Sequence, residues 1–233
     1  MSTIAANLQA VEATIGEAVQ AAGRARDEVQ LLAVSKTFPA QAVLDAMASG
    51  QRAFGENYLQ EALDKIGNVA QAQPDAPVEW HFIGPIQSNK TRPIAASFHW
   101  VHTVERLKIA QRLSEQRPPE LGPLNICLQV NISGEASKSG ASEAELPELA
   151  RAVARLPNLR LRGLMAIPER ATEPEQQRAA FARLRKLHDA LRADGLALDT
   201  LSMGMSGDMA AAIAEGATIV RIGSAIFGAR NYE

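Results

Sequence analysis

The chain has 233 residues, of which 46% are hydrophobic, so it is long enough to build one sizeable core. Its 24 basic and 26 acidic residues give a net charge of −2 at pH 7. The chain therefore has no excess positive charge that would attract nucleic acid or an anionic membrane surface. We expect small metabolites as partners. A single cysteine, Cys127, excludes an intrachain disulfide and argues against a thiolate metal site, and its apolar surroundings predict a buried side chain.

The first segment of the chain predicts a helix. Its apolar residues Ile4, Leu8, Val11, Ile15 and Val19 recur at helical spacing. The segment lacks the basic leader and continuous apolar stretch of a secretion signal, and no run in the chain approaches the roughly 18 apolar residues that cross a bilayer. We therefore expect an additional N-terminal helix and a cytoplasmic protein.

Short apolar runs then alternate with amphipathic stretches, which is the pattern of a parallel sheet wrapped by helices. The predicted strands cover residues 31–35, 52–55, 79–83, 100–102, 125–130, 159–165, 200–203 and 218–222. Eight strands are the number in a TIM-type barrel. Because no linker is long enough to divide the chain, we expect a single (β/α)₈ barrel domain over residues 1–233.

Two sequence patterns predict where helices begin. Thr172 with Glu175, and Ser142 with Glu145, have the Ser/Thr-x-x-Glu spacing of a capping box. In this arrangement, the hydroxyl and the carboxylate satisfy the first free backbone N–H groups of the helix. The first pair is expected to open the amphipathic helix predicted over residues 174–192.

In such barrels the chemistry lies at the carboxyl ends of the strands. The residues that this rule selects are Lys36, Asn57, His81, His102, Asn131, the turn 165–168, Ser206 and Gly223. Lys36 has an ordinary explanation, because a lysine at a strand end readily reaches water. A nucleophilic role would require desolvation or a neighbouring positive charge, which Arg221 at a barrel mouth would supply.

Two loops near the other end of the chain suit a phosphate group. Residues 202–208 and the Gly223-Ser224 pair are rich in glycine and serine, and phosphate sites in barrels are frequently built after strands seven and eight. A lysine amine condenses with an aldehyde to give a Schiff base. One cofactor, pyridoxal 5'-phosphate (PLP), would use both Lys36 and these loops.

Several of these residues keep two interpretations. Ser206 is either the N-cap of a helix over residues 208–215 or a phosphate ligand, and these roles are compatible. Arg221 is either salt-bridged or, if it points inward, a donor to a pyridine nitrogen that weakens the ring as an electron sink. Asn57 either caps the next helix or contacts the cofactor ring. His81 is more often structural in such a strand but is able to contact a ligand.

The remaining chemistry-bearing residues add little. The four histidines show no metal-ligand spacing, so we expect no metal. Lys138 lies in the loop 131–140 on the same predicted face as Lys36. It is either a surface charge or a second amine that accepts an aldehyde cofactor by transimination.

Five segments together are similar to a known family. They are Ala33-Val34-Ser35-Lys36, Phe54-Gly55-Glu56-Asn57-Tyr58, Trp80-His81-Phe82-Ile83-Gly84-Pro85-Ile86-Gln87-Ser88-Asn89-Lys90, Leu201-Ser202-Met203-Gly204-Met205-Ser206-Gly207-Asp208 and Val220-Arg221-Ile222-Gly223-Ser224-Ala225-Ile226-Phe227-Gly228. Jointly they resemble, nearly end to end, the YggS/PROSC family of PLP homeostasis proteins, which is related to the barrel domain of alanine racemase.

The resemblance implies a fold-type III barrel that holds PLP as a Schiff base on Lys36. It places Arg221 near the pyridine nitrogen and Ser206, Gly223 and Ser224 around the phosphate. The full set of expected cofactor-binding residues is Lys36, Asn57, His81, Met203, Ser206, Arg221, Gly223 and Ser224. It further implies a monomer that regulates intracellular PLP supply, usually without demonstrated catalysis.

Three functions remain open at this point. The favoured one is a carrier that sequesters PLP and passes it to apo-enzymes. An amino acid racemase would need acid/base groups on both faces of the substrate. Lys36 serves one face, and the chain ends at Glu233 without a further domain to supply the other. A Schiff-base aldolase acting on a phosphosugar also uses a barrel lysine and a phosphate loop, but would bind no PLP.

Overall fold

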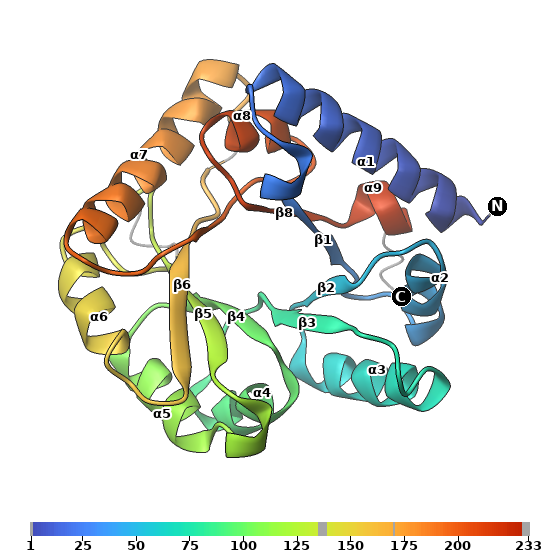
Figure 1. Cartoon of the computed structure of the whole chain (residues 1–233), viewed down its shortest axis with the longest axis horizontal. Coiled ribbons are helices and arrows are strands. Elements are labelled where there is room, and N and C mark those ends of the chain that lie inside the picture. Colours follow the sequence, from blue (N-terminus) through green and yellow to red (C-terminus); the bar gives the residue numbers. More distant parts are fainter. Residues whose placement is uncertain (1, 135–138, 170, 230–233) are drawn as a thin grey trace.

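The computed structural model describes residues 2–134, 139–169 and 171–229, and these residues form a closed barrel of eight parallel strands (Figure 1). Each strand pairs with the next along the chain, and β8 pairs with β1 to close the barrel. The strands are β1 (Gln30–Val34), β2 (Ala53–Glu56), β3 (Glu79–Phe82), β4 (Trp100–Val104), β5 (Leu124–Gln129), β6 (Leu159–Met165), β7 (Thr200–Ser202) and β8 (Ile219–Ile222). The predicted (β/α)₈ barrel is confirmed. The predicted second amine, Lys138, lies outside the described residues.

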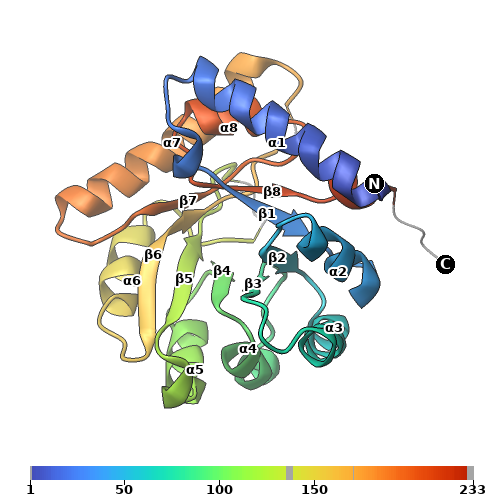
Figure 2. The same cartoon turned by 45° about the vertical axis from the view of Figure 1, so that its right-hand side comes forward.

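Helices surround the barrel and connect successive strands (Figures 1 and 2). The α-helices are α1 (Thr3–Ala21), α2 (Ala40–Ala48), α3 (Leu59–Ala72), α4 (Thr91–Ser97), α5 (Leu107–Gln116), α6 (Leu146–Val153), α7 (Pro174–Ala193), α8 (Met209–Ala214) and α9 (Ser224–Phe227). Short 3₁₀ helices cover Arg26–Glu28, Ser88–Lys90 and Pro119–Leu121.

Most strand positions are buried on both faces, which is why most strands are short apolar runs, although β6 also carries Arg160 and Arg162. In β1, Leu31 and Ala33 face the layer of helices, whereas Leu32 and Val34 face the barrel interior. The inward apolar side chains form a separate cluster of Leu32, Val34, Ala53, Ile83, Trp100, Cys127, Met165 and Ile219. Cys127 is buried there as predicted, and burial raises the pKa of its thiol to about 12.

The additional N-terminal helix is present and completes the outer layer. α1 packs beside α8, α9 and α2, and it buries Leu8, Val11, Ile15 and Val19. Asn7 Nδ2 also donates a hydrogen bond of 2.9 Å to the carbonyl of Ile226 in α9. Because α9 is a single short turn, α1 supplies the apolar cover on this side of the barrel (Figure 2).

The reciprocal hydrogen bonds of one of the two predicted capping boxes are present, although α6 begins at Leu146 with Glu145 as its N-cap. Ser142 Oγ accepts a hydrogen bond from the Glu145 N–H at 3.3 Å, and a Glu145 carboxylate oxygen accepts the Ser142 N–H at 3.3 Å. The prediction for Thr172 is wrong. Helix α7 has Glu173 as its N-cap and Pro174 as its first residue, so Glu175 falls one position short of the place that a capping box requires.

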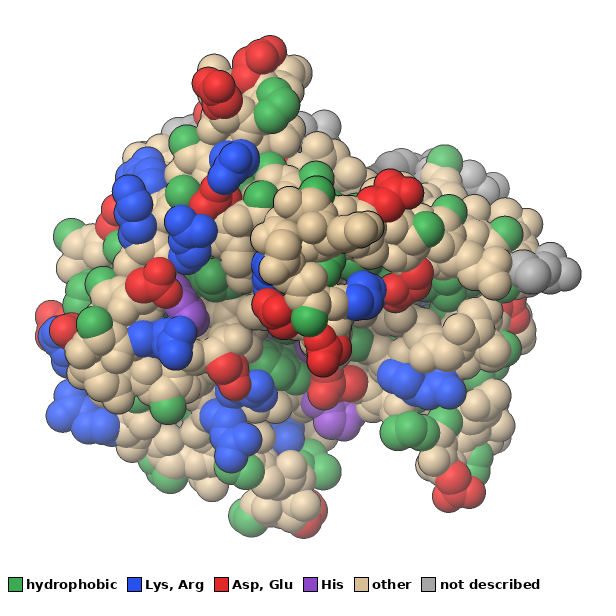
Figure 3. All heavy atoms as spheres, turned by 45° about the horizontal axis from the view of Figure 1, so that its top comes forward, with side chains coloured by type: hydrophobic (Ala, Val, Ile, Leu, Met, Phe, Trp, Pro, Cys, Tyr) green, Lys and Arg blue, Asp and Glu red, His purple; other side chains and the backbone are tan. Residues whose placement is uncertain are grey.

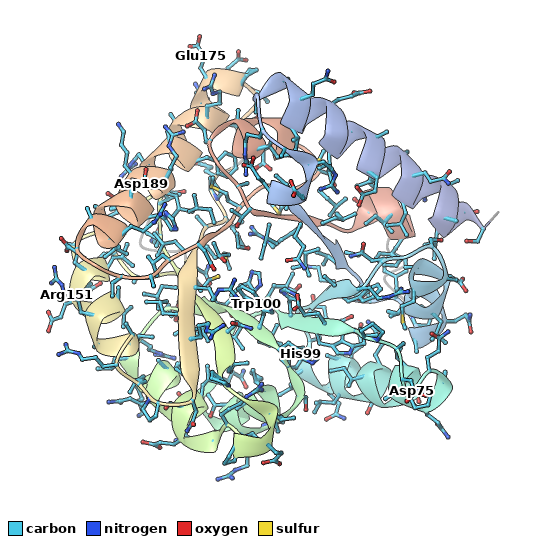
Figure 4. The ribbon with its side chains drawn as sticks, in the orientation of Figure 1. Asp75, His99, Trp100, Arg151, Glu175 and Asp189 are labelled. Carbon is cyan, nitrogen blue, oxygen red and sulfur yellow. The ribbon has the colours of Figure 1, made fainter. Side chains whose placement is uncertain are left out.

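The surface carries charges of both signs. Figure 3 shows basic and acidic side chains interspersed over one face of the molecule. Figure 4 places Arg151 and Asp189 at the periphery, whereas Trp100 lies toward the barrel interior. Among the described helices, none combines the length and apolar content that crossing a bilayer requires.

Candidate functional site

A cavity of about 560 Å³ opens at the carboxyl ends of the strands. It is lined by Val34, Lys36, Asn57, Ile83, Ile167, Ala171, Thr172, Gln177, Met205, Ser206, Gly207, Asp208, Arg221, Gly223 and Ser224. Six of the eight predicted cofactor-binding residues therefore meet in one cavity, although they come from opposite ends of the chain. They are Lys36, Asn57, Ser206, Arg221, Gly223 and Ser224.

His81 and Met203 are not among the residues that line this cavity. His81 is fully buried in the barrel, and its two ring nitrogens lie 2.9 Å from His102 Nε2 and 2.8 Å from a Glu79 carboxylate oxygen. Met203 is fully buried, and its N–H donates to the carbonyl of Ile219 at 3.1 Å. The structure thus separates these two residues from the other six.

The backbone that carries Lys36 is anchored by a buried ionic cluster that the sequence did not reveal. Lys65 Nζ, on α3, lies 2.8 Å from the Ser35 carbonyl, 2.6 Å from Glu56 Oε1 and 2.9 Å from Glu61 Oε1. Ser35 Oγ donates to the same Glu56 oxygen at 2.6 Å. Lys65, Glu56 and Ser35 are all buried, so the amine immobilises the peptide group that precedes Lys36.

The peptide group that follows Lys36 is held by the same cluster. Thr37 N–H donates to Glu61 Oε1 at 2.7 Å, and Thr37 has a φ of 69°. A β-branched residue in this left-handed region is strained, and such strain persists only where surrounding contacts enforce it. The two neighbours of Lys36 are therefore fixed by contacts from α3, which sets the direction in which its side chain leaves the strand.

Arg221 points into the barrel rather than into solvent. It is 5% exposed, its Nη1 donates to Ser202 Oγ at 2.7 Å and its Nη2 donates to the Ala166 carbonyl at 3.0 Å. Burial lowers the pKa of Arg221 to about 10, which still leaves it a cation at neutral pH. The geometry supports the inward orientation of Arg221, and its donation to a pyridine nitrogen stays a prediction.

The two glycine- and serine-rich loops line the cavity, and each leads into a short helix. The first precedes α8 and the second precedes α9. Ser206 is not the N-cap of α8, because that position belongs to Asp208, whose Oδ1 accepts the Met205 N–H at 2.6 Å. Gly223 fits closely against the end of β1, where an added Cβ would lie 3.1 Å from the carbonyl oxygen of Val34. Residues of both loops, including Ser206 and Gly223, form part of the cavity wall.

Asn57 also is not a helix cap, because Tyr58 occupies the N-cap position of α3. Its Oδ1 is buried and has no hydrogen-bond partner among the described residues, although Asn57 lines the cavity. Gly84 allows the close approach that places Asn57 here, since an added Cβ would lie only 2.0 Å from the Asn57 carbonyl oxygen. An unsatisfied buried acceptor facing a cavity is a site for a ligand donor or a bound water.

Thr172 and Gln177 also line the cavity, although the sequence did not mark them as site residues. Thr172 precedes α7, and Gln177 lies in α7 with its Nε2 donating to the Ala171 carbonyl at 2.8 Å. Ile167, which lies in the predicted turn 165–168, lines the cavity as well. Thr172 was interpreted only as a helix cap, and loop residues of this kind carry no periodic signal. A second cavity of about 270 Å³ adjoins the first and shares Asn57, Ile83 and Ile167 with it.

Comparisons with known proteins identify the family of this chain. The sequence pattern of the family described as alanine racemase, N-terminal domain, matches residues 6–231. A Pseudomonas aeruginosa protein named pyridoxal phosphate homeostasis protein is 67% identical over 232 residues, covering 100% of this chain and 98% of that protein. The Escherichia coli K12 protein of the same name is 54% identical, covering 100% of this chain and 99% of that protein.

Solved structures show the same fold. PipY of Synechococcus elongatus PCC7942, whose structure was solved with PLP bound, has a TM-score of 0.83 and 34% identity, covering 97% of this chain and 100% of that chain. Alanine racemase of Corynebacterium glutamicum has a TM-score of 0.72 at 20% identity and covers 97% of this chain but 61% of that chain, so it supports the fold alone. The resemblance stated from the sequence is confirmed, and the chain belongs to the family of pyridoxal phosphate homeostasis proteins built on the alanine racemase N-terminal domain.

Proposed function

We propose that this protein binds PLP and serves in PLP homeostasis by holding the cofactor and supplying it to other proteins. The observation that carries the proposal is that one cavity brings together the Lys36 amine, the Arg221 guanidinium and the serine-bearing phosphate loops. The names of the full-length relatives and the PLP-bound PipY structure support it.

The residues present fit the cofactor by their chemistry. PLP needs an amine for its aldehyde, donors for its phosphate and a partner for its ring nitrogen. Lys36, the loop around Ser206 and the Gly223-Ser224 turn, and Arg221 are of these three kinds, and they line the same cavity. An added Cβ at Gly223 would lie 3.1 Å from the Val34 carbonyl oxygen, so the absence of a side chain lets this loop lie close to β1 where it lines the cavity.

We assign roles accordingly. Lys36 attaches the cofactor covalently with loss of one water, and Ser206, Gly223 and Ser224 bind the phosphate. Arg221 donates to the ring nitrogen, and Asn57 Oδ1 accepts a hydrogen bond from the ligand or from a water beside it. We assign no direct cofactor contact to His81 or Met203, because the cavity lining excludes them.

When bound, PLP supplies an aldehyde carbon that amines attack and a conjugated ring that takes up electrons. The second property depends on a protonated ring nitrogen. Arg221 is cationic and donates hydrogen bonds only, so it holds that nitrogen in its unprotonated form. The residue thereby favours retention of the cofactor over carbanion chemistry, which supports the carrier function rather than the racemase.

We extend the proposal to a monomeric, cytoplasmic protein that delivers PLP to apo-enzymes. The family resemblance supports these three properties. Delivery is tested by mixing PLP-loaded protein with a PLP-free transaminase and following the transaminase activity that returns. Direct delivery predicts recovery faster than the measured rate of PLP release into buffer, and recovery limited to that rate contradicts delivery.

The decisive experiment for binding is the absorption spectrum of the purified protein incubated with PLP, before and after borohydride reduction. We expect a visible band that reduction removes, with a pyridoxyl group on Lys36 found by peptide mapping. Lys36→Arg is the matched control, because it keeps the positive charge and removes the reactive amine. A wild-type protein that stays colourless and unmodified contradicts the proposal and favours the aldolase interpretation.

A further inference from the structure

A chain of buried hydrogen bonds crosses the interior of the barrel beneath the cavity. Arg221 Nη1 donates to Ser202 Oγ at 2.7 Å, and Ser202 Oγ lies 2.7 Å from His102 Nδ1. His102 Nε2 lies 2.9 Å from His81 Nδ1, and His81 Nε2 lies 2.8 Å from Glu79 Oε1. The chain therefore connects β8, β7, β4 and β3 in one series of contacts.

The charge states along this chain are set by burial. Both histidines are fully buried, and burial lowers the pKa of His81 and lowers that of His102 further, so both rings are neutral at neutral pH. The hydrogen bond from His81 lowers the pKa of Glu79 to about 2, so Glu79 is a carboxylate. The chain thus has a cation at one end, an anion at the other and neutral groups between them.

The two ends fix the position of every hydrogen between them. Because the Glu79 carboxylate only accepts, His81 must carry its hydrogen on Nε2, which leaves Nδ1 as an acceptor. His102 must then donate from Nε2, and its Nδ1 accepts the hydroxyl hydrogen of Ser202. Ser202 Oγ in turn receives the N–H of Arg221, so all four hydrogen bonds run in the same direction.

Glu79 lies at the far end of the barrel from the cavity. It begins β3, whereas Arg221 lies on β8 and lines the cavity at the carboxyl ends of the strands. The Glu79 side chain is 40% exposed, and Gln30 Nε2 donates to its Oε1 at 3.2 Å. Trp100 stacks on the His81 ring with centroids 5.4 Å apart and planes 5° from parallel, which holds that ring in position.

We propose that Glu79 is a positioning residue for Arg221. By fixing the tautomers of His81 and His102 through the chain, it orients the hydroxyl of Ser202 so that the oxygen faces the guanidinium. With the opposite tautomers, His102 Nδ1 would donate to Ser202 Oγ. That oxygen would then be shared between His102 and Arg221 as donors, and its own hydrogen would have no acceptor in the chain to hold its orientation. The cofactor-related part of this inference rests on the proposed function, because there Arg221 holds the ring nitrogen of PLP.

The first test uses cofactor-free protein labelled with nitrogen-15, so it does not depend on PLP binding. Wild-type protein is expected to show both histidines as Nε2–H tautomers and one ordered set of Arg221 guanidinium resonances. Glu79→Met removes the acceptor and should change the His81 and His102 tautomer signals and shift the Arg221 resonances. Glu79→Gln keeps the shape but offers both an acceptor oxygen and an amide donor, so it should allow both histidine tautomers and shift the Arg221 resonances less than Glu79→Met does.

The second test asks whether the effect travels through Ser202. We expect Glu79→Met to weaken PLP binding about tenfold, as loss of one aligned hydrogen bond to a charged group does. In a Ser202→Ala background, where the chain is already broken, Glu79→Met should change PLP affinity by less than about twofold. Thermal unfolding of each variant identifies those that fold, and Glu79→Gln supplies the folded comparison if Glu79→Met does not.

An Nδ1–H tautomer for either histidine in wild-type protein overturns the proposal. So does an Arg221 signal that Glu79→Met leaves unchanged, or an equal loss of PLP affinity with and without Ser202. A wild-type protein that binds no PLP at all refutes the proposed function instead. In that case the tautomer and Arg221 signals still decide whether Glu79 positions the guanidinium.

Discussion

Lys65 Nζ lies 2.6 Å from Glu56 Oε1, and both side chains are buried beside the strand end that leads to Lys36. An ion pair at such depth is weak evidence for stability, because removing two charges from water costs several kcal/mol per ion. Burial in fact raises the pKa of Glu56 in spite of the neighbouring ammonium. The pair instead fixes local geometry, since the same lysine also binds the Ser35 carbonyl.

Replacing Lys65 with methionine should destabilise the fold by about 3 to 5 kcal/mol at neutral pH, because Glu56 is left buried without a counter-charge. The loss should shrink as pH falls, because Glu56 then folds in its protonated form. Urea unfolding at several pH values measures both effects. A Glu56→Gln, Lys65→Met double variant should recover part of the loss, and a Lys65→Met protein as stable as wild type contradicts this account.

Thr37→Gly should raise the free energy of unfolding by about 0.5 to 1 kcal/mol, since glycine adopts a positive φ without strain but loses more entropy on folding. Thr37→Val is the matched control, because it removes the hydroxyl and keeps the branched Cβ. Chemical denaturation compares the three proteins. If valine stabilises the fold as much as glycine does, strain at φ 69° is not the cause.

Gly84→Ala should destabilise the protein by at least about 2 kcal/mol, because its Cβ would clash with the Asn57 carbonyl at 2.0 Å. It should also weaken PLP binding by displacing Asn57 from the cavity. Gly67→Ala is the control, since its Cβ meets nothing within 4 Å in α3 and should stabilise the helix by about 1 kcal/mol. Equal behaviour of the two variants in thermal unfolding would refute the steric explanation.

The pKa of Glu79 is lowered from 4.5 to about 2 by its hydrogen bond with His81, so its carboxylate stabilises the folded state. That contribution is complete above pH 4.5 and is lost as pH falls toward 2. The free energy of unfolding should therefore be higher for wild-type protein than for Glu79→Gln. This difference should be largest at pH 6 to 7 and should become smaller below pH 4.5. A difference that is constant from pH 7 to pH 3 would show that the pKa of Glu79 does not change on folding.

The fold was predictable because the strands of a parallel barrel are buried on both faces and leave continuous apolar runs. β6 begins and ends where the sequence predicts, at Leu159–Met165. The extra residues of β4 come from pairing after an irregularity, where Val104 aligns with Leu128, and no local pattern encodes that contact. That the whole chain is one domain stays a prediction.

The site was predictable where a strand-end residue and a small-residue loop carry recognisable chemistry, as at Lys36 and Gly223. The strand-end rule also selected His81, because it does not distinguish a side chain at the mouth of the barrel from one buried below it. Lys65 was missed for a different reason. A lysine in an amphipathic helix is ordinarily solvated, and nothing local indicates that Glu56 and Ser35 meet it in space.

The seam between β1 and β8 joins the two ends of the described chain, where Ala33 pairs with Ile222. Lys36 and Arg221 therefore become neighbours only after the last strand has closed the barrel. A ribosome-bound chain that has not yet released this strand has Lys36 but no complete pocket around it. If Lys36 attaches PLP as proposed, capture of the aldehyde is confined to chains that have closed the barrel, and unfinished chains compete for it no better than any other exposed lysine.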